Sequence, residues 1–170
     1  MIRYLMYLNC LAIWACSNGK TGGNPTISPN ELIELNKRQH HAEIEYIQTY
    51  IDTLKWEMSE SNTGIFYKIY SRGSNDTIRT GAEVGVWQKV STLEIPPFKT
   101  SLLEGNKIVH VDNDVSEAGV HQALKMMCMG DSGIFIIPSH LAYGLTGLTN
   151  QVQPNTPLLY SIKAEKKPSP

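Results

Sequence analysis

The chain has 170 residues, of which 41% are hydrophobic and 18% charged, and its 15 basic residues nearly balance 16 acidic ones. This length and composition fit one globular domain with extensions and exclude a disordered or collagen-like chain. No block of Lys or Arg is longer than the Lys166-Lys167 pair, so the sequence carries no electrostatic footprint for binding nucleic acid.

The first 15 residues are predicted to be a lipoprotein signal peptide. Arg3 supplies an early positive charge, and an apolar stretch follows that is shorter than the roughly 20 residues needed to span a bilayer. The small Ala15 before Cys16, together with the polar run after it, resembles a bacterial lipobox, in which the cysteine is lipidated. A plain cleaved signal and a shortened anchor helix are the alternatives. Lipidation of Cys16 would anchor the protein to a membrane of the cell envelope, and the acid-poor run after Cys16 favours the periplasmic side of the outer membrane.

Residues 16–29 are predicted to form a flexible tether, because they are rich in Gly, Ser, Thr, Asn and Pro. A helix is predicted over residues 30–60, with Ser28 or Asn30 as its N-cap. Its apolar residues largely follow a three-four spacing and so share one stripe: Ile33, Ile44, Ile47, Ile51, Leu54 and Met58. We expect this stripe to pack on the protein's own domain. A partner helix in a homodimer is the alternative.

Residues 61–165 are predicted to form an α+β domain, followed by a polar tail over 166–170. Alternating β-forming residues predict strands at 65–70, 83–90, 107–111, 133–137 and 158–164. One short helix is predicted before the strand at 133–137, with Asp114 or Ser116 as its N-cap and with Gly130, in a left-handed conformation, as its stop. This order predicts an antiparallel sheet wrapped around a short α-helix.

Residue types alone indicate no catalytic machinery. The sequence contains no Gly-x-Ser-x-Gly, no P-loop and no Gly-x-Gly-x-x-Gly motif. The three cysteines, Cys10, Cys16 and Cys128, show no zinc-ligand spacing, which argues against a structural metal site, and no cofactor is predicted. The scattered histidines are expected at the surface or the core edge: His40, His41, His110, His121 and His140.

Residues 119–160 carry a more specific pattern. A helix that begins at Gly119 is followed by an apolar strand ending in Pro138, by the turn Ala142-Tyr143-Gly144, and by Pro154-x-x-x-Leu158 with an aromatic residue two positions later. This stretch resembles the C-terminal half of an FKBP-type peptidyl-prolyl cis-trans isomerase. With the lipobox, tether and long helix, the chain is similar to the gliding-motility-associated FKBP lipoproteins of Bacteroidetes.

The resemblance implies an apolar, aromatic pocket that binds proline-containing polypeptides and uses no nucleophile. On the positions that match the family, the implied catalytic residues are Tyr143, Phe98 and Tyr160. The implied substrate-binding residues are Val115, Ser116, Val120, Val152 and Trp87.

Three departures from the family pattern concern this pocket. Lys99 follows Phe98 where the family commonly has Asp, Val120 replaces the Trp of many members, and Trp87 or Gln88 stands where the family often has Tyr. The implied function is isomerisation of X-Pro bonds in exported proteins. The alternatives are a catalytically weak proline-binding chaperone or assembly component of a gliding-motility or secretion machine, and a structural lipoprotein with an unrelated fold.

Overall fold

The computed structural model of the chain describes residues 28–98 and 100–167. The predicted signal peptide, Cys16, nearly all of the predicted tether, and Lys99 lie outside these described residues. None of the helices in the described part is long and apolar enough to cross a membrane. The lipid anchor therefore stays a prediction.

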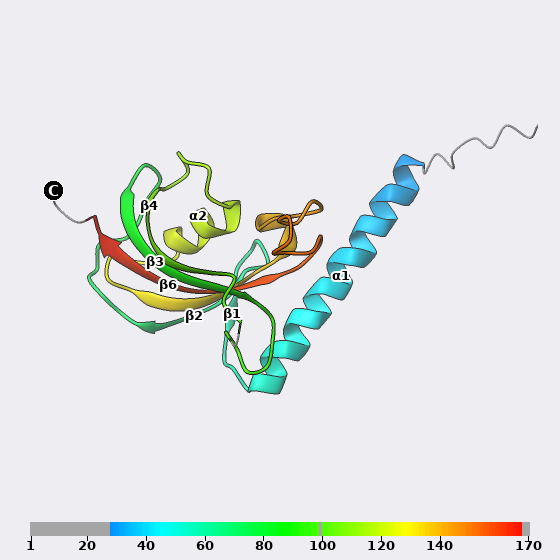
Figure 1. Ribbon diagram of the computed structural model, residues 1–170, viewed down its shortest axis with the longest axis horizontal. Helices are drawn as coiled ribbons and strands as arrows, with labels where there is room; N and C mark the ends of the chain where they lie inside the picture. The colour runs from blue at the N-terminus through cyan, green and yellow to red at the C-terminus, as the bar shows by residue number, and fades with distance from the viewer. Residues whose placement is uncertain (1–27, 99, 168–170) are drawn as a thin grey trace, which may run out of the picture. The chain divides into compact units, whose positions relative to one another are not determined.

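The described part contains two α-helices, six strands and one 3₁₀-helix (Figure 1). In chain order they are α1 (Pro29–Leu54), β1 (Ser59–Glu60), β2 (Phe66–Ser71), β3 (Glu83–Thr92), β4 (Leu103–His110), α2 (Ala118–Lys125), β5 (Ser132–Ile137), η1 (Ser139–Leu141) and β6 (Leu158–Lys166).

The chain divides into two compact units after Asn36. In the first unit, the described residues are the cap and the first turns of α1. The Glu31 amide donates to the Ser28 hydroxyl at 3.2 Å, which confirms Ser28 as the N-cap. Ile33 is 52% exposed in this unit.

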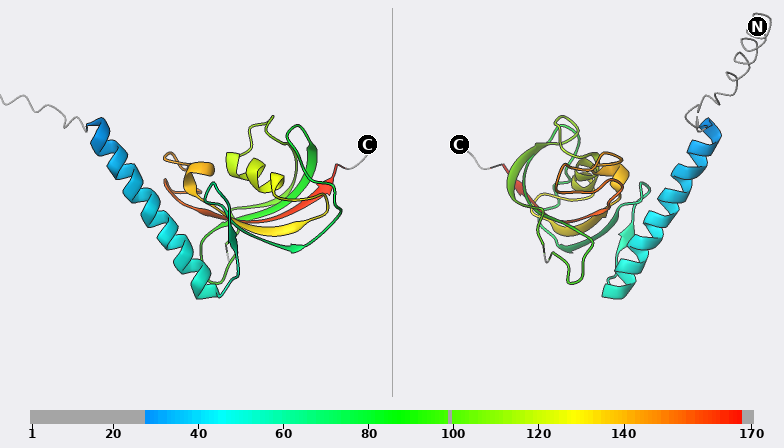
Figure 2. Two further views of the ribbon diagram at one scale, coloured as in Figure 1. Left: turned by 180° about the vertical axis from the view of Figure 1, so that it is seen from behind. Right: turned by 45° about the vertical axis from the view of Figure 1, so that its right-hand side comes forward.

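The second unit, residues 37–170, contains the sheet. Its strand order is β1-β2-β5-β6-β3-β4, and every neighbouring pair is antiparallel. The sheet curves around α2, and the two views in Figure 2 show this enclosure from behind and from the side. The predicted fold class, an antiparallel sheet wrapped around a short helix, is confirmed.

Side chains alternate across the strands and feed two separate hydrophobic clusters. Tyr160 and Phe135 face the cluster that contains α2, whereas their neighbours Leu159 and Ile136 face the cluster that contains α1. We call the first the α2 cluster; its members include Val84, Val86, Val90, Val120, Ala123, Leu124, Met127, Phe135, Val152, Tyr160 and Ile162. We call the second the α1 cluster; its buried members are Ile47, Tyr50, Ile51, Phe66, Leu93, Ile136 and Leu159.

The α1 cluster confirms the expectation that the helix stripe packs on the domain, for the part of the stripe in the second unit. Ile47 is fully buried and Ile51 is 8% exposed. Two tyrosines of the same helix also bond to the loop after β3, because the hydroxyls of Tyr46 and Tyr50 donate to the Leu93 and Glu94 carbonyls at 3.1 and 2.9 Å.

The predicted ends of both helices were wrong. The helix α1 ends at Leu54 and not at residue 60, because Lys55 adopts a left-handed φ of 53° and turns the chain toward β1. The helix α2 ends at Lys125. Gly130 is left-handed, as predicted, with a φ of 87°, but it lies in the turn that follows, where its amide donates to the Ala164 carbonyl on β6 at 2.7 Å.

The predicted N-caps of α2 were wrong for a different reason. The N-cap position is Glu117, which makes no side-chain capping bond. The Asp114 carboxylate instead accepts the amides of His110 at 2.7 Å and Ser116 at 2.8 Å, so it shapes the turn between β4 and α2.

Candidate functional site

Tyr143 lies in the connection between η1 and β6, in a loop fixed by its own backbone. The Tyr143 carbonyl accepts the Gly147 amide at 3.1 Å, and the Ser139 carbonyl accepts the Gly144 amide at 2.7 Å. Gly147 has a φ of 64°, and a Cβ there would overlap the Val152 carbonyl oxygen, so only glycine lets the two arms of the loop approach this closely. The loop therefore holds Tyr143 in place.

Four of the predicted site residues meet at the α2 cluster. Val120 on α2 is fully buried, Tyr160 on β6 is 1% exposed, and Val152 is 6% exposed. Tyr143 is half-buried and packs against the same cluster. Two tyrosine rings and two valines thus give the apolar, partly aromatic surface that the sequence predicts.

Glu117 adds a carboxylate to this surface. Glu117 lies beside the Tyr143 hydroxyl and interacts with it electrostatically. Glu117 is 17% exposed, and its Oε2 lies 3.8 Å from the ammonium of Lys107, which is beyond hydrogen-bond range. This Oε2 is buried without a hydrogen-bond partner among the described residues, and so is the hydroxyl of Tyr160.

Electrostatics link these three side chains. Burial and the neighbouring Glu117 carboxylate raise the pKa of the Tyr143 hydroxyl far above its ordinary value. Burial raises the pKa of Tyr160 as well, and the charges of Glu117 and Tyr143 raise it further. Both hydroxyls therefore stay protonated at neutral pH and can act as hydrogen-bond donors.

Gln88 is another polar group on this face of the sheet. It is 2% exposed, and its Oε1 has no hydrogen-bond partner in the described part of the chain. Register places Gln88 opposite Ile162 and places Val90 opposite Tyr160, so Gln88 shares a face with Tyr160. Buried polar atoms without partners are rare in folded proteins.

Trp87 needs a correction, because it lies on the other face of β3. The side chains of Val86 and Gln88 point toward α2, and the alternation along a strand turns Trp87 away from them. The sequence left Trp87 and Gln88 as alternatives for this position, and the register decides for Gln88.

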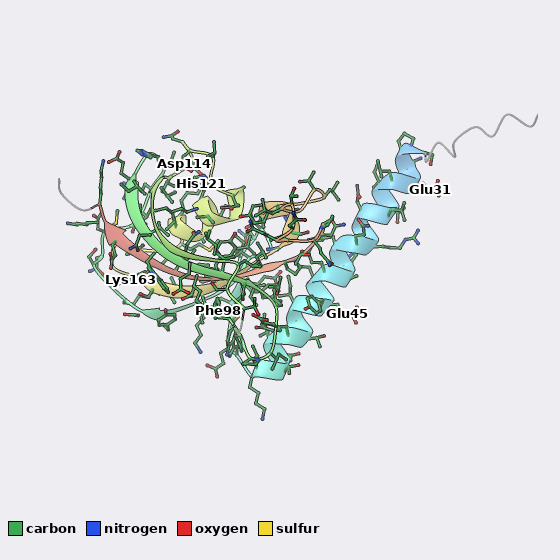
Figure 3. All side chains as sticks on the ribbon, viewed as in Figure 1. Glu31, Glu45, Phe98, Asp114, His121 and Lys163 are labelled. Atoms are coloured by element: carbon green, nitrogen blue, oxygen red, sulfur yellow. The ribbon has the colours of Figure 1, made fainter. Side chains whose placement is uncertain are left out.

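Phe98 is the second correction, since the structure does not bring it to Tyr143. It lies in the loop between β3 and β4, has a left-handed φ of 57°, and packs against the α1 cluster. Figure 3 shows the Phe98 label on the side of the sheet opposite α2. The predicted role of Phe98 as a wall of the Tyr143 pocket does not fit this position.

The turn that leads into α2 accounts for the two remaining predicted residues. Val115 is fully exposed. The Ser116 amide is already bonded to Asp114, so it is not free to bind a peptide backbone. Asp114 also lies beside His121, whose Nε2 is 3.4 Å from its Oδ1 (Figure 3). His121 is 6% exposed, as expected for a residue at the core edge.

A cavity of 480 Å³ adjoins the site in the loop that follows Tyr143. It is lined by residues 146 and 148–154, and it shares Val152 with the α2 cluster.

Sequence reasoning missed Glu117 as a site residue, because an acidic residue at the start of a helix is explained by the helix dipole. The signal that could have identified Glu117 was its position close to Val120. Glu117 precedes Gly119 and Val120 by one turn or less, and Val120 was already among the implied substrate-binding residues.

Comparison with known proteins gives a matching family, a curated relative and similar solved structures. The family model for FKBP-type peptidyl-prolyl cis-trans isomerases matches residues 74–165, more than half of the chain. FK506-binding protein 2A of Rhizopus delemar is 28% identical over 97 residues, which cover 57% of this chain and 56% of that protein. The chain thus spans about half the length of this curated relative.

Two crystal structures share the fold. One is a peptidyl-prolyl cis-trans isomerase from Pseudomonas syringae, with a TM-score of 0.60 and 22% identity, covering 74% of this chain and 92% of that one. The other is FkpA from Escherichia coli, with a TM-score of 0.60 and 20% identity, covering 85% of this chain and 76% of that one.

Proposed function

The chain belongs to the FKBP-type peptidyl-prolyl cis-trans isomerase family, and on that premise we propose that it catalyses the isomerisation of X-Pro peptide bonds at the Tyr143 site. The observation that carries the proposal is the convergence of Tyr143, Tyr160, Val120 and Val152 on one apolar surface. Isomerisation needs no nucleophile, so the lack of nucleophile motifs in the sequence fits this chemistry.

The apolar surface would lower the barrier to rotation by favouring the twisted prolyl amide. Rotation about a peptide bond costs roughly 18 to 20 kcal/mol, because it breaks amide resonance. The planar amide carries more charge separation than the twisted one, so a surface that removes water from the prolyl amide favours the twisted state. Val152 and the half-buried ring of Tyr143 supply this apolar contact, and the buried Val120 and Tyr160 pack within the same cluster.

The Tyr143 hydroxyl positions the substrate. It stays protonated, and it lies at the half-buried edge of the cluster, where a substrate carbonyl can accept its hydrogen bond. To do so the substrate replaces Glu117 as acceptor. A proline ring on the apolar surface and a carbonyl at Tyr143 fix both ends of the rotating bond.

A second candidate function is a proline-binding chaperone or assembly module with weak catalysis. The placement of Phe98 in the α1 cluster favours it, because the Tyr143 site then lacks that aromatic wall. The Glu117 carboxylate favours it too, since it lies beside the Tyr143 hydroxyl and competes for it. Binding without turnover is the result that separates this function from the first.

We also propose a cell-envelope location, with the protein anchored through lipidated Cys16 and acting on exported polypeptides. The support is the signal-like pattern of residues 1–15 and the lipobox-like Ala15-Cys16. A role in gliding motility is proposed from the resemblance that the sequence pattern alone suggests. Mass spectrometry of the membrane fraction tests the anchor, with Cys16→Ser as the unlipidated control.

A protease-coupled assay tests the isomerase proposal. The full chain is assayed on an Ala-Leu-Pro-Phe substrate beside Tyr143→Ala and beside Tyr70→Ala, a matched control at an exposed tyrosine of β2. We expect wild type and Tyr70→Ala to accelerate the reaction and Tyr143→Ala to lose most of the acceleration. A folded wild-type protein that binds the peptide without accelerating it would establish the binding module instead.

A further inference from the structure

Three metal-binding side chains converge on the second unit away from the α2 cluster. His40 and Glu43 come from α1, His140 comes from η1, and their ligand atoms all lie within 4.8 Å of one another. The two histidines are exposed and Glu43 is half-buried. The proposed function does not use this group.

Helix geometry explains why two of the three share one direction. His40 and Glu43 are three residues apart on α1, so they lie on the same helix face. The His140 ring meets the His40 ring edge-on, with 5.6 Å between the ring centroids and an interplanar angle of 78°. The three ligands therefore face a common point from two elements.

Glu43 is already held in a ligand-like orientation. Its Oε1 accepts the Ser139 amide at 2.6 Å, and its Oε2 accepts the Ser139 hydroxyl at 3.0 Å. Each carboxylate oxygen has a second lone pair, which these bonds leave free. Carboxylates that bind metals are held in this way by outer hydrogen bonds, which fix their direction before the ion arrives.

We propose that His40, Glu43 and His140 bind a divalent transition-metal ion, with Zn²⁺ as the preferred ion. Two imidazoles and one carboxylate are a zinc ligand set that leaves a fourth position for water. Ligand atoms around tetrahedral zinc lie about 3.4 Å apart, given bond lengths of about 2.0 to 2.2 Å. The exposed imidazoles have the rotamer freedom to close from the present spacing to that distance.

The ion joins two elements that are distant in sequence. It bridges the middle of α1 to η1, and the chain runs from η1 through Ala142 to Tyr143. Metal binding therefore adds a cross-link between α1 and the turn that carries the tyrosine. Because binding to the folded state alone stabilises that state, zinc should raise the thermal stability of the protein.

The sequence did not reveal this site. Inspection of Cys and His spacing found no structural metal pattern, because the ligands are a His-x-x-Glu pair and a histidine about a hundred residues later. His40 and His140 were both expected only as scattered histidines at the surface or the core edge.

Isothermal titration of the full chain, carrying no affinity tag, with ZnCl₂ tests the proposal. We expect His40→Gln and His140→Gln each to weaken the zinc Kd at least tenfold. Ser139→Ala, which removes one outer hydrogen bond to Glu43, should weaken it about tenfold. The matched control His41→Gln removes an exposed histidine from the adjacent position of α1, and should leave the Kd within about twofold.

Thermal unfolding separates loss of the site from loss of the fold. Without metal, all four variants should unfold within a few degrees of wild type. With zinc, the midpoint should rise for wild type and His41→Gln and rise clearly less for His40→Gln and His140→Gln. The proposal is overturned if wild type binds no zinc up to millimolar concentration, or if His40→Gln and His140→Gln bind it as tightly as wild type.

Discussion

In the proposed function, the Tyr143 hydroxyl has two competing acceptors, which are the neighbouring Glu117 carboxylate and a substrate carbonyl. A carboxylate is the stronger acceptor, because hydrogen bonds to charged groups are about twice as strong as neutral ones. Glu117 therefore holds Tyr143 in a state that the substrate must displace.

Replacing Glu117 with Leu should raise kcat/KM for an X-Pro peptide by about three- to tenfold, since a hydrogen bond to a charged group contributes roughly 1.5 to 3 kcal/mol and only part of this opposes binding. The assay is the protease-coupled one, with Glu104→Leu, an exposed acid on β4, as the control. A lower kcat/KM for Glu117→Leu would show that the carboxylate helps the substrate.

Tyr160 offers a test of stability. Its hydroxyl is buried without a hydrogen-bond partner among the described residues, and such a group destabilises the folded state. Tyr160→Phe keeps the ring and removes the oxygen, so it should raise the free energy of unfolding by about 1 kcal/mol. Urea denaturation measures this change, and a loss of stability would mean that the hydroxyl has a partner in solution.

Asp131 determines how the fold responds to acid. Its side chain is fully buried and accepts the amides of Gly73 at 2.7 Å and Cys128 at 2.9 Å, and Arg72 lies 3.2 Å away. Burial acts to raise the pKa of this carboxyl, but the two amides and the Arg72 charge outweigh burial and lower it. The charged form is thus bound more favourably in the folded state.

The sign of the pH dependence follows from this lowered pKa. The stabilisation by Asp131 is present above the unfolded pKa of about 3.9 and is lost as the pH falls through the lower folded pKa. Asp131→Asn should therefore cost about 3 kcal/mol at pH 7, and the difference from wild type should shrink below about pH 4. Urea denaturation between pH 3 and 7 measures both curves, and parallel curves would contradict this account.

At the scale of elements, the part of α1 in the second unit covers the sheet face opposite α2 through a few large side chains. Ile47 is fully buried in the α1 cluster, and Leu and Ile to Ala changes at such sites cost about 2 to 5 kcal/mol. We expect Ile47→Ala to lower the free energy of unfolding by about 3 kcal/mol. The control Ile33→Ala, at a 52% exposed position of the same helix, should stay within about 0.5 kcal/mol of wild type.

Equal stability of Ile47→Ala and wild type would mean that α1 leaves the sheet in solution. Ile33 belongs to the same predicted stripe but is exposed, so a partner helix in a homodimer stays a prediction for this part of α1. Sedimentation of wild type and Ile33→Ala tests it, because a dimer held by this part of α1 would dissociate more readily in the variant.

The elements themselves were largely predictable from the sequence, because period and β-propensity are local properties. The predicted strands at 83–90 and 158–164 lie within β3 and β6. The ends were less predictable, since they depend on contacts that are distant in sequence. Gly130 has the conformation expected of a helix stop, yet its amide bonds to Ala164 on β6, and the helix ends earlier.

The site residues also divide into those that the sequence predicted and those that it did not. Tyr143, Tyr160, Val120 and Val152 were found from a motif whose residues lie on or beside regular elements. Phe98 was misplaced because it belongs to a loop between β3 and β4, and no periodicity fixes the direction of a loop side chain. The sequence could not decide between Trp87 and Gln88, because a shift of one residue along a strand exchanges the two faces of the sheet.

At the scale of the whole chain, the two faces of the curved sheet pack against different elements. Its inner face encloses α2 and presents the tyrosines, and its outer face carries the α1 cluster. The inner face, with α2, lies largely in the part of the chain that the FKBP-type isomerase family model matches. The proposed zinc site lies between α1 and η1, which leads to Tyr143.

The central claim is that this chain turns over X-Pro bonds at Tyr143. Exchange NMR on an Ala-Leu-Pro-Phe peptide at equilibrium measures this directly, because it needs no protease and observes both isomers. With a catalytic amount of the full chain, exchange should become much faster than the tens of seconds of the uncatalysed reaction, and Tyr143→Ala should restore most of the slow rate. Exchange that stays at the uncatalysed rate while the peptide binds the folded protein would contradict the claim.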